Sequence, residues 1–288
     1  MPNPETSRPA AWPALPAEKP DIRLIAADLD DTLLNDELII TPRTIKAIQA
    51  ARGQGVVFTI ATGRAFKSAL PYALELGLDA PLITFQGAMV VKPDGQVVSH
   101  RPMDREISLE VVDFLLSFGR HVTLYINEGL YIENTSPATE RYRSRIRVEV
   151  NQVPSLRDIL AGCREGATKF VLIAEPEEIR EIMGVFRSRF EGRLQAVPSR
   201  TDFLEISRAD NGKGVALSEM AAQMGLDRRQ VMAIGDSPND LDMIAYAGWG
   251  VSMANGVDEV KREARWITAS NNDEGVAIAI ENLVLRNG

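Results

Sequence analysis

Carboxylates follow two short apolar runs of this sequence directly. Asp28 and Asp30 come after the run at residues 22–27. Asp236 comes after the run at residues 231–234. Runs of this length predict buried strands, and the carboxyl ends of parallel strands meet at one edge of a sheet. We therefore expect these carboxylates to lie close together, where they would repel one another unless a cation joined them.

Such a group of acids suits Mg²⁺. Carboxylate and carbonyl oxygens are the ligands that this ion prefers, and the bound ion retains waters and also takes phosphate oxygens. The chain has only two histidines and one cysteine, so a zinc site with nitrogen and sulfur ligands is not expected.

Two further residues suit a phosphate group. Thr62 follows another apolar run, at residues 56–61, and offers a hydroxyl donor, whereas Lys213 offers a positive charge. The backbone N–H groups after Asp28 can also point toward an anion. A carboxylate that attacks a phosphate dianion faces about 4 kcal/mol of repulsion per charge pair at contact distance in an effective dielectric near 20. Such an attack would therefore need both the metal and Lys213.

Each of these patterns also has a plain structural interpretation. Residues 28–32 alone could form a polar turn, and residues 62–64 alone could cap a helix. The segment at 211–214 alone could be an exposed loop. Residues 235–240 are more specific, because two acids and an amide follow an apolar strand immediately. The four patterns in this order, each in a matching context, are hard to attribute to chance.

The segments around these residues alternate between expected strands and helices. This alternation predicts a parallel sheet that is covered by helices on both faces, and right-handed crossovers place all strand ends along one edge. The expected strands lie at residues 22–27, 56–61, 81–85, 231–234, 249–253 and near 266. The expected helices lie at residues 42–51, from 64 to about 76, at 213–224, after 240, at 257–264 and from 274 onward.

The middle of the chain, roughly residues 86–199, has a different pattern. Lys-Pro-Asp-Gly at 92–95, between valine-rich runs, predicts a hairpin turn. We therefore expect an α+β insert with antiparallel character. Its expected strands lie at residues 122–126, 147–150 and 169–174, and its expected helices at 106–119 and 176–190.

The expected domain organisation follows from these patterns. Residues 1–20 contain six prolines and are expected to form a disordered or extended arm. Residues 21–85 and 200–288 would form the core domain, and residues 86–199 would be inserted into it.

Composition narrows the classes of partner and location. The net charge of −8 argues against a nucleic-acid or anionic-membrane binder, although an anionic substrate needs only a local positive pocket. The single cysteine, Cys163, excludes an intrachain disulfide and fits a reducing cytoplasm. We interpret it as an ordinary small residue rather than a nucleophile. No apolar run has the length of a membrane span, and no secretory signal is recognisable. The expected location is the cytoplasm.

Together the patterns resemble the motifs of the haloacid dehalogenase (HAD) superfamily, and more narrowly of its Cof-type phosphatases. The resemblance covers nearly the whole chain from residue 22 onward. Phe203-Leu204-Glu205-Ile206, which leads into Lys213, is also similar to this subgroup. The four motifs lie at residues 28–33, 61–64, 213 and 235–240.

This resemblance implies an α/β fold with two domains. The core would be a Rossmann-like parallel sheet of the HAD type. The insert would be an α+β cap of the C2 type, which would close over the site, exclude water and choose the substrate.

The resemblance also implies a role for each motif residue. Asp28 would be the nucleophile that forms an aspartyl-phosphate, and Asp30 would protonate the leaving oxygen and then activate water. Mg²⁺ would be held by Asp28, the backbone carbonyl of Asp30, and Asp236. Asp240 would contact these ligands rather than the ion itself. The residues implied in phosphate binding are Thr62, Gly63, Lys213 and Asn239.

The sequence departs from the family pattern at two positions. Asp31 stands where many members have glycine, at a position without a catalytic role. Gln86 stands where asparagine is common, which leaves the substrate contacts near it open. For Arg64, packing is favoured over a substrate contact.

The resulting expectation is Mg²⁺-dependent hydrolysis of a small phosphate monoester, either a sugar phosphate or a phosphorylated cofactor. Two alternatives remain: a phosphomannomutase-like phosphotransferase, and a non-enzymatic receiver or binding module. Asp30 and the large insert argue against a receiver, which needs neither. The expected partner is a small phosphorylated metabolite, and the expected assembly is a monomer or weak homodimer. The sequence does not name the substrate.

Overall fold

The computed structural model describes residues 18–135, 137, 139–140 and 149–285. The first 17 residues of the predicted N-terminal arm lie outside this range. By their contacts the described residues form two compact units. The first unit contains the residues up to Ala61, Leu76–Ala80 and the residues from Leu217 onward; the second contains Thr62–Glu75 and Pro81–Ala216.

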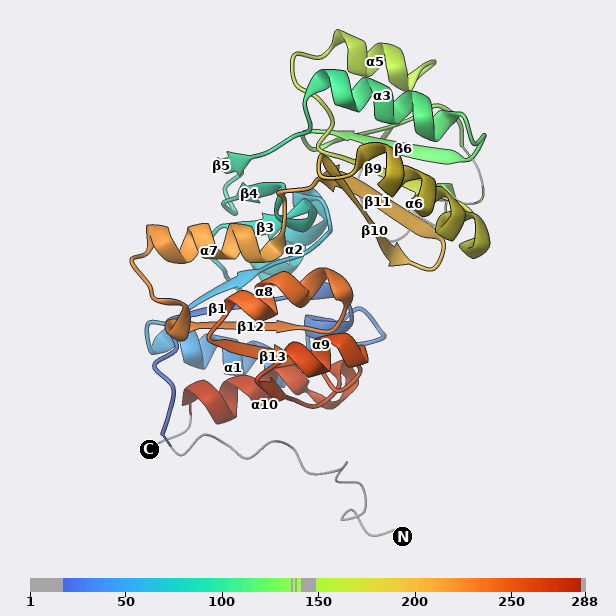
Figure 1. The fold of residues 1–288 in the computed structure, drawn as a ribbon. Helices are drawn as coiled ribbons and strands as arrows, with labels where there is room; N and C mark the ends of the chain where they lie inside the picture. Colours follow the sequence, from blue (N-terminus) through green and yellow to red (C-terminus); the bar gives the residue numbers. More distant parts are fainter. Residues whose placement is uncertain (1–17, 136, 138, 141–148, 286–288) are drawn as a thin grey trace. The chain divides into compact units, whose positions relative to one another are not determined.

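The first unit is built on a five-stranded parallel sheet (Figure 1) with the order β14-β13-β12-β1-β2. β1 lies between β2 and β12, and its last residue, Ala27, is level with Ile60 and Ile234. These three strands therefore end together at one edge, as the sequence predicts. The strands are β1 (Leu24–Ala27), β2 (Val57–Ile60), β12 (Val231–Gly235), β13 (Trp249–Ser252) and β14 (Trp266–Ile267).

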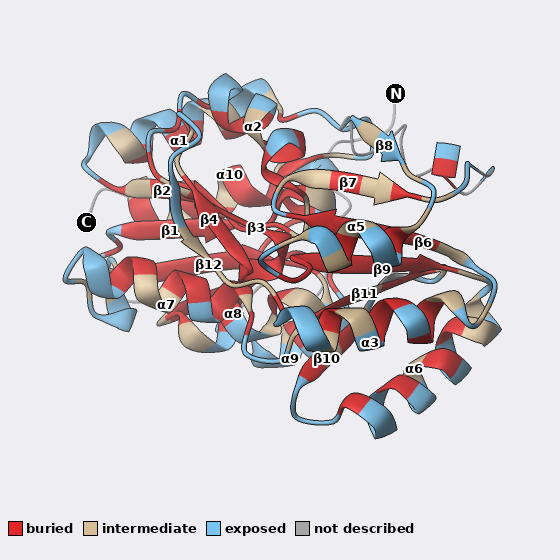
Figure 2. Cartoon of the chain, turned by 90° about the horizontal axis from the view of Figure 1, so that it is seen from above, coloured by how far each residue is buried: buried red, intermediate tan, exposed pale blue. Residues whose placement is uncertain are grey.

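Helices cover both faces of this sheet, in agreement with the predicted fold class. α1 packs on β2 and α10, whereas α8 packs on β12 and β13. The strands are buried along their length, and the helices carry exposed residues on their outer sides (Figure 2). Pro42 occupies the first turn of α1, and the Thr41 hydroxyl accepts a bond from the Thr44 N–H, as expected of a helix start. The helices are α1 (Pro42–Gly53), α8 (Leu241–Tyr246), α9 (Asp258–Glu263) and α10 (Gly275–Ile280). α7 (Lys213–Gln223) begins in the second unit and ends in the first.

The second unit contains a six-stranded, mainly antiparallel sheet with the order β10-β11-β9-β6-β7-β8. Its apolar core includes Phe114, Phe186 and Phe190, whose rings are in mutual contact. The expected helices and the expected strands at 122–126 and 169–174 are observed, whereas the expected strand at 147–150 lies partly outside the described residues. Four further elements, β7, β10, β11 and α5, were not expected. The strands are β6 (His121–Ile126), β7 (Gly129–Ile132), β8 (Val150–Gln152), β9 (Lys169–Ile173), β10 (Leu194–Arg200) and β11 (Phe203–Arg208). The helices are α3 (Arg105–Leu116), α5 (Leu156–Gly162) and α6 (Pro176–Phe190).

A smaller antiparallel sheet, β3-β4-β5, and helix α2 (Phe66–Glu75) complete the second unit. The predicted hairpin turn at 92–95 is confirmed: Gly95 has a φ of +89° and donates to the Lys92 carbonyl. The expected third parallel strand, at residues 81–85, instead pairs antiparallel with β4, because the chain reverses directly after it. The strands are β3 (Leu82–Thr84), β4 (Met89–Val91) and β5 (Val97–His100).

The predicted insert and the observed second unit have different boundaries. β11 belongs to the six-stranded sheet, which therefore continues to Arg208, beyond the expected end of the insert at residue 199. Residues 62–75 and 81–85, which we assigned to the core domain, share contacts with the second unit. The predicted domain boundaries stay a prediction. Among the described residues, no helix combines the length and apolar character that a membrane span requires.

Candidate active site

Asp28 lies where β1 ends. Its N–H still donates to the Ile234 carbonyl of β12 at 2.9 Å, so the residue is fixed to the sheet, and it is only 4% exposed. The chain then enters a wide helical turn, Leu29–Leu33, in which Leu33 donates to the Asp28 carbonyl at 3.3 Å. Asp31 adopts a φ of +56° within this turn. The sheet therefore fixes the position of Asp28, and the turn directs the chain away from it.

Asp236 follows β12, and Asp240 holds the turn in which it lies. One carboxylate oxygen of Asp240 accepts from the N–H groups of Asp236 and Ser237, both at 3.0 Å. A Cβ atom on Gly235 would lie 2.5 Å from the Asp240 carboxyl carbon. Glycine at 235 is thus required for the close approach that orders this turn.

Three buried carboxylates meet beyond the ends of these two strands. Oxygens of Asp28, Asp236 and Asp240 all lie within 4.8 Å of one another. We call this group the carboxylate cluster. The Thr32 hydroxyl donates to Asp236 at 2.7 Å. Like charges at this spacing repel one another strongly in a buried setting, and an oxygen-preferring divalent cation would relieve that repulsion. The donor set therefore fits Mg²⁺, with Asp28 and Asp236 as the best placed ligands, since one oxygen of Asp240 already accepts two N–H bonds.

Two other predicted residues of the first unit are close to the cluster in sequence but outside it. Asp30 is half-buried, and its backbone is extended, with a φ of −75° and a ψ of 134°. Asn239 lies in the turn that precedes α8 and accepts a bond from the Ser237 hydroxyl at 2.7 Å. Their assigned roles stay predictions.

Thr62 and Gly63 form a tight turn in the second unit. The Thr62 N–H donates to the Ile83 carbonyl at 2.8 Å, and the Thr62 hydroxyl oxygen accepts from the Arg64 N–H at 3.2 Å. Thr62 is 1% exposed. It is not the cap of α2, because the Glu128 carboxylate accepts from the first two N–H groups of that helix. The plain interpretation of residues 62–64 as a helix cap is therefore wrong.

No pattern in the sequence points to Glu128. Its two oxygens accept from Phe66 at 3.2 Å and Lys67 at 3.1 Å. Burial raises the pKa of the Glu128 carboxyl, and the two N–H bonds partly oppose that rise. A carboxylate at a helix N-terminus is favourable, because it satisfies N–H groups that the helix itself leaves without acceptors.

Gln86 covers Gly63. Phe85 and Gln86 both have positive φ angles, +51° and +56°, and a Cβ atom on Gly63 would lie 2.4 Å from the Gln86 side-chain nitrogen. Two such residues in succession are strained, and the surrounding contacts must hold them. The N–H groups of Phe85 and Gln86 donate to the carbonyls of Arg64 and Thr62. The turn at 62–64 is therefore fastened to the segment that carries Gln86.

The structure also shows the surroundings of Lys213 and Arg64. Lys213 is fully buried at the start of α7, so it does not lie in an exposed loop. A Cβ atom on Gly87 would lie 2.1 Å from the Gly212 carbonyl, so the chain before Lys213 packs tightly. The Arg64 guanidinium lies 5.5 Å from the centre of the Tyr72 ring, and its role stays a prediction.

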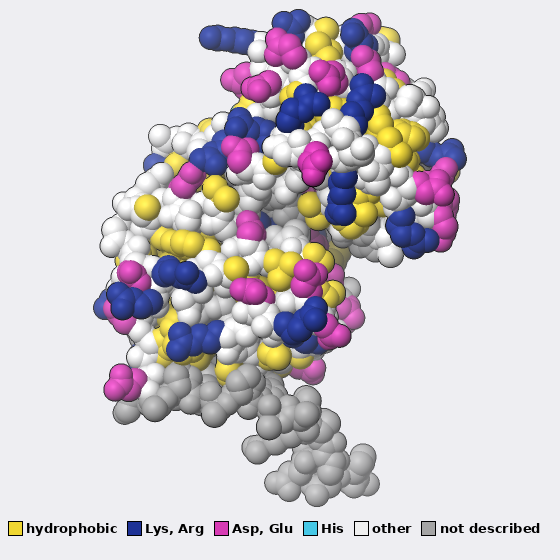
Figure 3. Space-filling view, in the orientation of Figure 1, with side chains coloured by type: hydrophobic (Ala, Val, Ile, Leu, Met, Phe, Trp, Pro, Cys, Tyr) yellow, Lys and Arg dark blue, Asp and Glu magenta, His cyan; other side chains and the backbone are white. Residues whose placement is uncertain are grey.

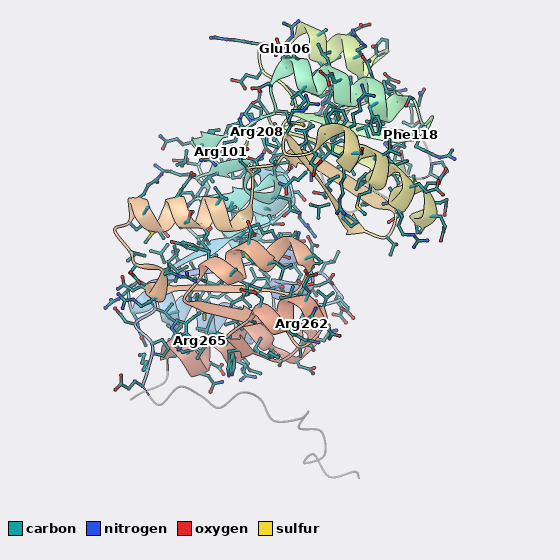
Figure 4. All side chains as sticks on the ribbon, in the orientation of Figure 1. Arg101, Glu106, Phe118, Arg208, Arg262 and Arg265 are labelled. Atoms are coloured by element: carbon teal, nitrogen blue, oxygen red, sulfur yellow. The ribbon has the colours of Figure 1, made fainter. Side chains whose placement is uncertain are left out.

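A separate pocket of about 470 Å³ in the second unit is lined by several arginines, including Arg101 and Arg208 (Figure 4). Arg208 is bound by Asp210 at 2.7 Å, and this carboxylate raises the pKa of the Arg208 guanidinium. The lining also contains Asp104, Glu106 and Glu165. Acidic and basic side chains likewise alternate over the face seen in Figure 3. The four arginines of this lining therefore lie among three acidic side chains, and one of the arginines, Arg208, is paired with Asp210.

Comparison with known proteins decides the family. Residues 25–280 match the family model of the haloacid dehalogenase-like hydrolases. This chain belongs to that family. The predicted membership of the HAD superfamily is confirmed, whereas the narrower resemblance to its Cof-type phosphatases stays a prediction. The alternative of a non-enzymatic receiver module is set aside, because the chain is a HAD-type hydrolase.

Two relatives and one solved structure illustrate the match. A protein of Streptococcus pyogenes serotype M6 is 33% identical over 268 residues, which cover 92% of this chain and 99% of that protein. The 5-amino-6-(5-phospho-D-ribitylamino)uracil phosphatase YwtE of Bacillus subtilis is 30% identical over 283 residues, with 91% and 98% covered. The crystal structure of TM0651 from Thermotoga maritima matches with a TM-score of 0.80 at 28% identity, over 90% of this chain and 97% of that one.

For this HAD hydrolase, the predicted site residues fall into two groups. The structure brings Asp28, Asp236 and Asp240 together in the first unit. Thr62, Gly63 and Lys213 belong to the second unit. Their joint action with the carboxylates is part of the proposal that follows.

Proposed function

We propose that this protein hydrolyses the phosphate monoester of a small molecule in a Mg²⁺-dependent reaction, through an aspartyl-phosphate on Asp28. One observation carries the proposal. In a chain of the HAD hydrolase family, Asp28 is buried at the end of a central parallel strand and lies within 4.8 Å of Asp236 and Asp240. A carboxylate in such a place repels its neighbours and so contributes little to stability, whereas a bound metal ion would hold it ready to act as a nucleophile.

The carboxylate cluster supports the metal part of the proposal. Asp28, Asp236 and the backbone carbonyl of Asp30 would hold the ion, which supplies positive charge near the phosphate oxygens. Asp240 would keep Asp236 in place through the two N–H bonds that it accepts, and Thr32 would orient the Asp236 carboxylate through its hydroxyl.

Asp28 and Asp30 would carry the chemistry. A carboxylate oxygen of Asp28 attacks phosphorus, and the bond from phosphorus to the leaving oxygen breaks. Asp30 gives its proton to that oxygen. Asp30 then takes a proton from water, which attacks the phosphorus of the aspartyl-phosphate and releases inorganic phosphate with free Asp28. Atoms and charges balance over the two steps, and Asp30 recovers its proton.

Four residues would bind the phosphate: Thr62, Gly63, Lys213 and Asn239. A hydroxyl that accepts a bond can still donate its own proton, so the Arg64 N–H leaves the Thr62 proton able to point at an oxyanion. Buried Lys213 would supply a point charge in a setting of low dielectric, where it is worth far more than in water.

The proposed substrate is a small phosphorylated metabolite, either a sugar phosphate or a phosphorylated cofactor or its precursor. YwtE is named for a uracil that carries a phosphorylated ribityl chain, and this name supports the class rather than the compound. Residues 86–199 would choose among such substrates. We further propose a cytoplasmic location, a monomer or weak homodimer, and neither nucleic acid nor membrane as partner, in keeping with the net charge of −8.

Turnover of p-nitrophenyl phosphate with Mg²⁺ tests the proposal. Asp28→Asn should abolish it, because an amide oxygen is a far weaker nucleophile and binds the metal less well. Asp31→Asn is the matched control: Asp31 is exposed in the same turn, and asparagine tolerates its positive φ. Substantial turnover by Asp28→Asn would refute the assignment of the nucleophile. Phosphate release without any sugar acceptor separates hydrolysis from phosphotransfer.

A further inference from the structure

A buried ion pair in the second unit supports the turn at 62–64. The Lys169 side chain is 4% exposed, and its ammonium donates to the Glu205 carboxylate at 3.1 Å and to the Gly63 carbonyl at 2.9 Å. The rings of Phe85 and Tyr125 lie 5.6 and 5.4 Å from the same ammonium. Two oxygen acceptors and two aromatic faces therefore fix the position of this cation.

The ion pair contacts a backbone peptide group, the one whose carbonyl belongs to Gly63. Lys169 begins β9 and Glu205 lies on β11, two strands that pair directly. Gly63 lies more than a hundred residues earlier in the sequence. The Glu205 carboxylate holds the ammonium, and the ammonium draws electron density toward the Gly63 carbonyl oxygen. Hydrogen bonds in such a chain strengthen one another.

The same peptide group reaches the Thr62 hydroxyl. The Gly63 carbonyl and the Arg64 N–H belong to one peptide unit, and that N–H donates to the Thr62 hydroxyl oxygen at 3.2 Å. A cation on the carbonyl side makes the N–H side a better donor. The Thr62 hydroxyl is then oriented with its oxygen toward Arg64 and its proton away from it.

We propose that Lys169 and Glu205 are positioning residues that orient the Thr62 hydroxyl for the phosphate, through the Gly63–Arg64 peptide group. The inference rests on the proposed function, in which Thr62 binds the phosphate. Neither residue touches the substrate. Burying an ion pair often contributes nothing to stability relative to apolar residues of similar size, so its position on this peptide group is the feature that needs a functional reason.

The first test replaces the cation. Lys169→Met removes the charge and keeps most of the side-chain volume. Lys92→Met is the matched control, since Lys92 is only half-buried and its ammonium donates to the nearby Gln96 side chain. Lys169→Met should lower kcat/KM for p-nitrophenyl phosphate and weaken inhibition by inorganic phosphate, each by about 10- to 100-fold, the range typical of groups that orient a ligand. Lys92→Met should change neither by more than about twofold.

A cycle with Thr62→Val separates positioning from general support. If Lys169 acts through the Thr62 hydroxyl, Lys169→Met should cost at most about twofold once that hydroxyl is gone, because contacting residues in one network are not additive. An equal loss of kcat/KM in both backgrounds would overturn the proposal. Lys169→Arg, which retains a charged donor, should recover part of the loss, and a variant as poor as Lys169→Met would count against the proposed hydrogen bond.

A spectroscopic measurement does not depend on turnover. In the ¹⁵N–¹H spectrum of the full chain, Lys169→Met and Glu205→Gln should both move the Arg64 amide resonance, whereas Lys92→Met should leave it in place. If the Arg64 resonance moves but no variant or wild-type protein releases phosphate, the proposed function fails while the hydrogen-bonded chain stands. If phosphate is released but the Arg64 resonance does not move, the inference fails alone.

Discussion

Two buried groups of charged side chains differ in how their charges are balanced. The carboxylate cluster gathers Asp28, Asp236 and Asp240, all of one sign, with oxygens within 4.8 Å of one another. The pair of Lys169 and Glu205 joins opposite signs at 3.1 Å. Bound cations relieve the repulsion within a group of like charges, whereas an ion pair brings its own counter-charge. The comparison separates a site suited to a bound cation from a contact that positions a neighbouring segment.

Removal of the cation gives the largest expected effect. Dialysis against a chelator should reduce phosphatase turnover to background, and added Mg²⁺ should restore it, because the cluster repels a phosphate dianion without the ion. The release of phosphate before and after Mg²⁺ addition measures this. A chelated enzyme that keeps its full rate would contradict the role given to the carboxylate cluster.

Loss of the buried lysine at 213 comes next. Lys213→Ala should lower kcat by about a thousandfold, the cost typical of a lost charge-stabilising group in a closed site. Lys92→Ala, which removes a half-buried lysine at the hairpin turn of residues 92–95, provides the control. A near-normal kcat for Lys213→Ala would remove this residue from the mechanism and leave the phosphate site to the Thr62 turn.

In metal-free buffer, substitutions in the two groups should change the free energy of unfolding in opposite directions. Asp28→Asn removes one of three mutually repelling charges, so it should raise the free energy of unfolding in metal-free buffer by about 1 kcal/mol or more. Glu205→Gln leaves Lys169 with an uncompensated charge and should lower it by about 1–3 kcal/mol. Urea denaturation of the metal-free proteins would show this. A lower free energy of unfolding for both variants would contradict the proposed difference between the carboxylate cluster and the ion pair.

The smallest expected effect is a pH dependence of stability. Burial lowers the pKa of His100, although the Glu165 carboxylate partly offsets this, and burial also lowers the pKa of His121. Unfolding therefore takes up protons below the ordinary histidine pKa of about 6.5, so this contribution to stability is present above that pH and is lost as the pH falls toward the lowered values. Glu128, whose pKa is raised, contributes in the opposite direction.

A double variant, His100→Gln with His121→Gln, isolates the histidine part. Its free energy of unfolding should fall by about 1 kcal/mol less than that of the wild-type protein between pH 7 and pH 5. Parallel curves of unfolding free energy against pH for the two proteins would show that neither imidazole resists protonation in the folded state.

The carboxylate cluster can be predicted from the sequence because the patterns that indicate it are local. An apolar run followed at once by acids identifies the end of a buried strand, and the geometry of parallel strands brings Asp28 and Asp236 together. The same rule does not apply to residues 81–85. Their apolar run is an equally good strand, but two residues with positive φ, Phe85 and Gln86, reverse the chain into an antiparallel pair. A single sequence gives no sign of a positive φ at such residues.

The ion pair could not be predicted from the sequence. Lys169 opens a strand whose residues are all buried, where a lysine at the first position would be expected to face solvent. Its partners lie 36 and 106 positions away in the chain. Glu128 is similar, since the helix that it caps begins 62 residues earlier. Contacts between single polar residues at such separations leave no periodic signal, so only the folded chain reveals them.

The central claim is that Asp28 becomes phosphorylated, and trapping the phosphorylated residue tests it most directly. The Mg²⁺-loaded enzyme would be mixed with p-nitrophenyl phosphate, quenched in acid within the first turnover and reduced with borohydride, which converts an aspartyl-phosphate to homoserine. Mass spectrometry of the peptide that contains residues 24–33 should find that conversion at Asp28, and not in protein quenched without substrate. Turnover with no conversion, or with conversion at another acid, would contradict the account.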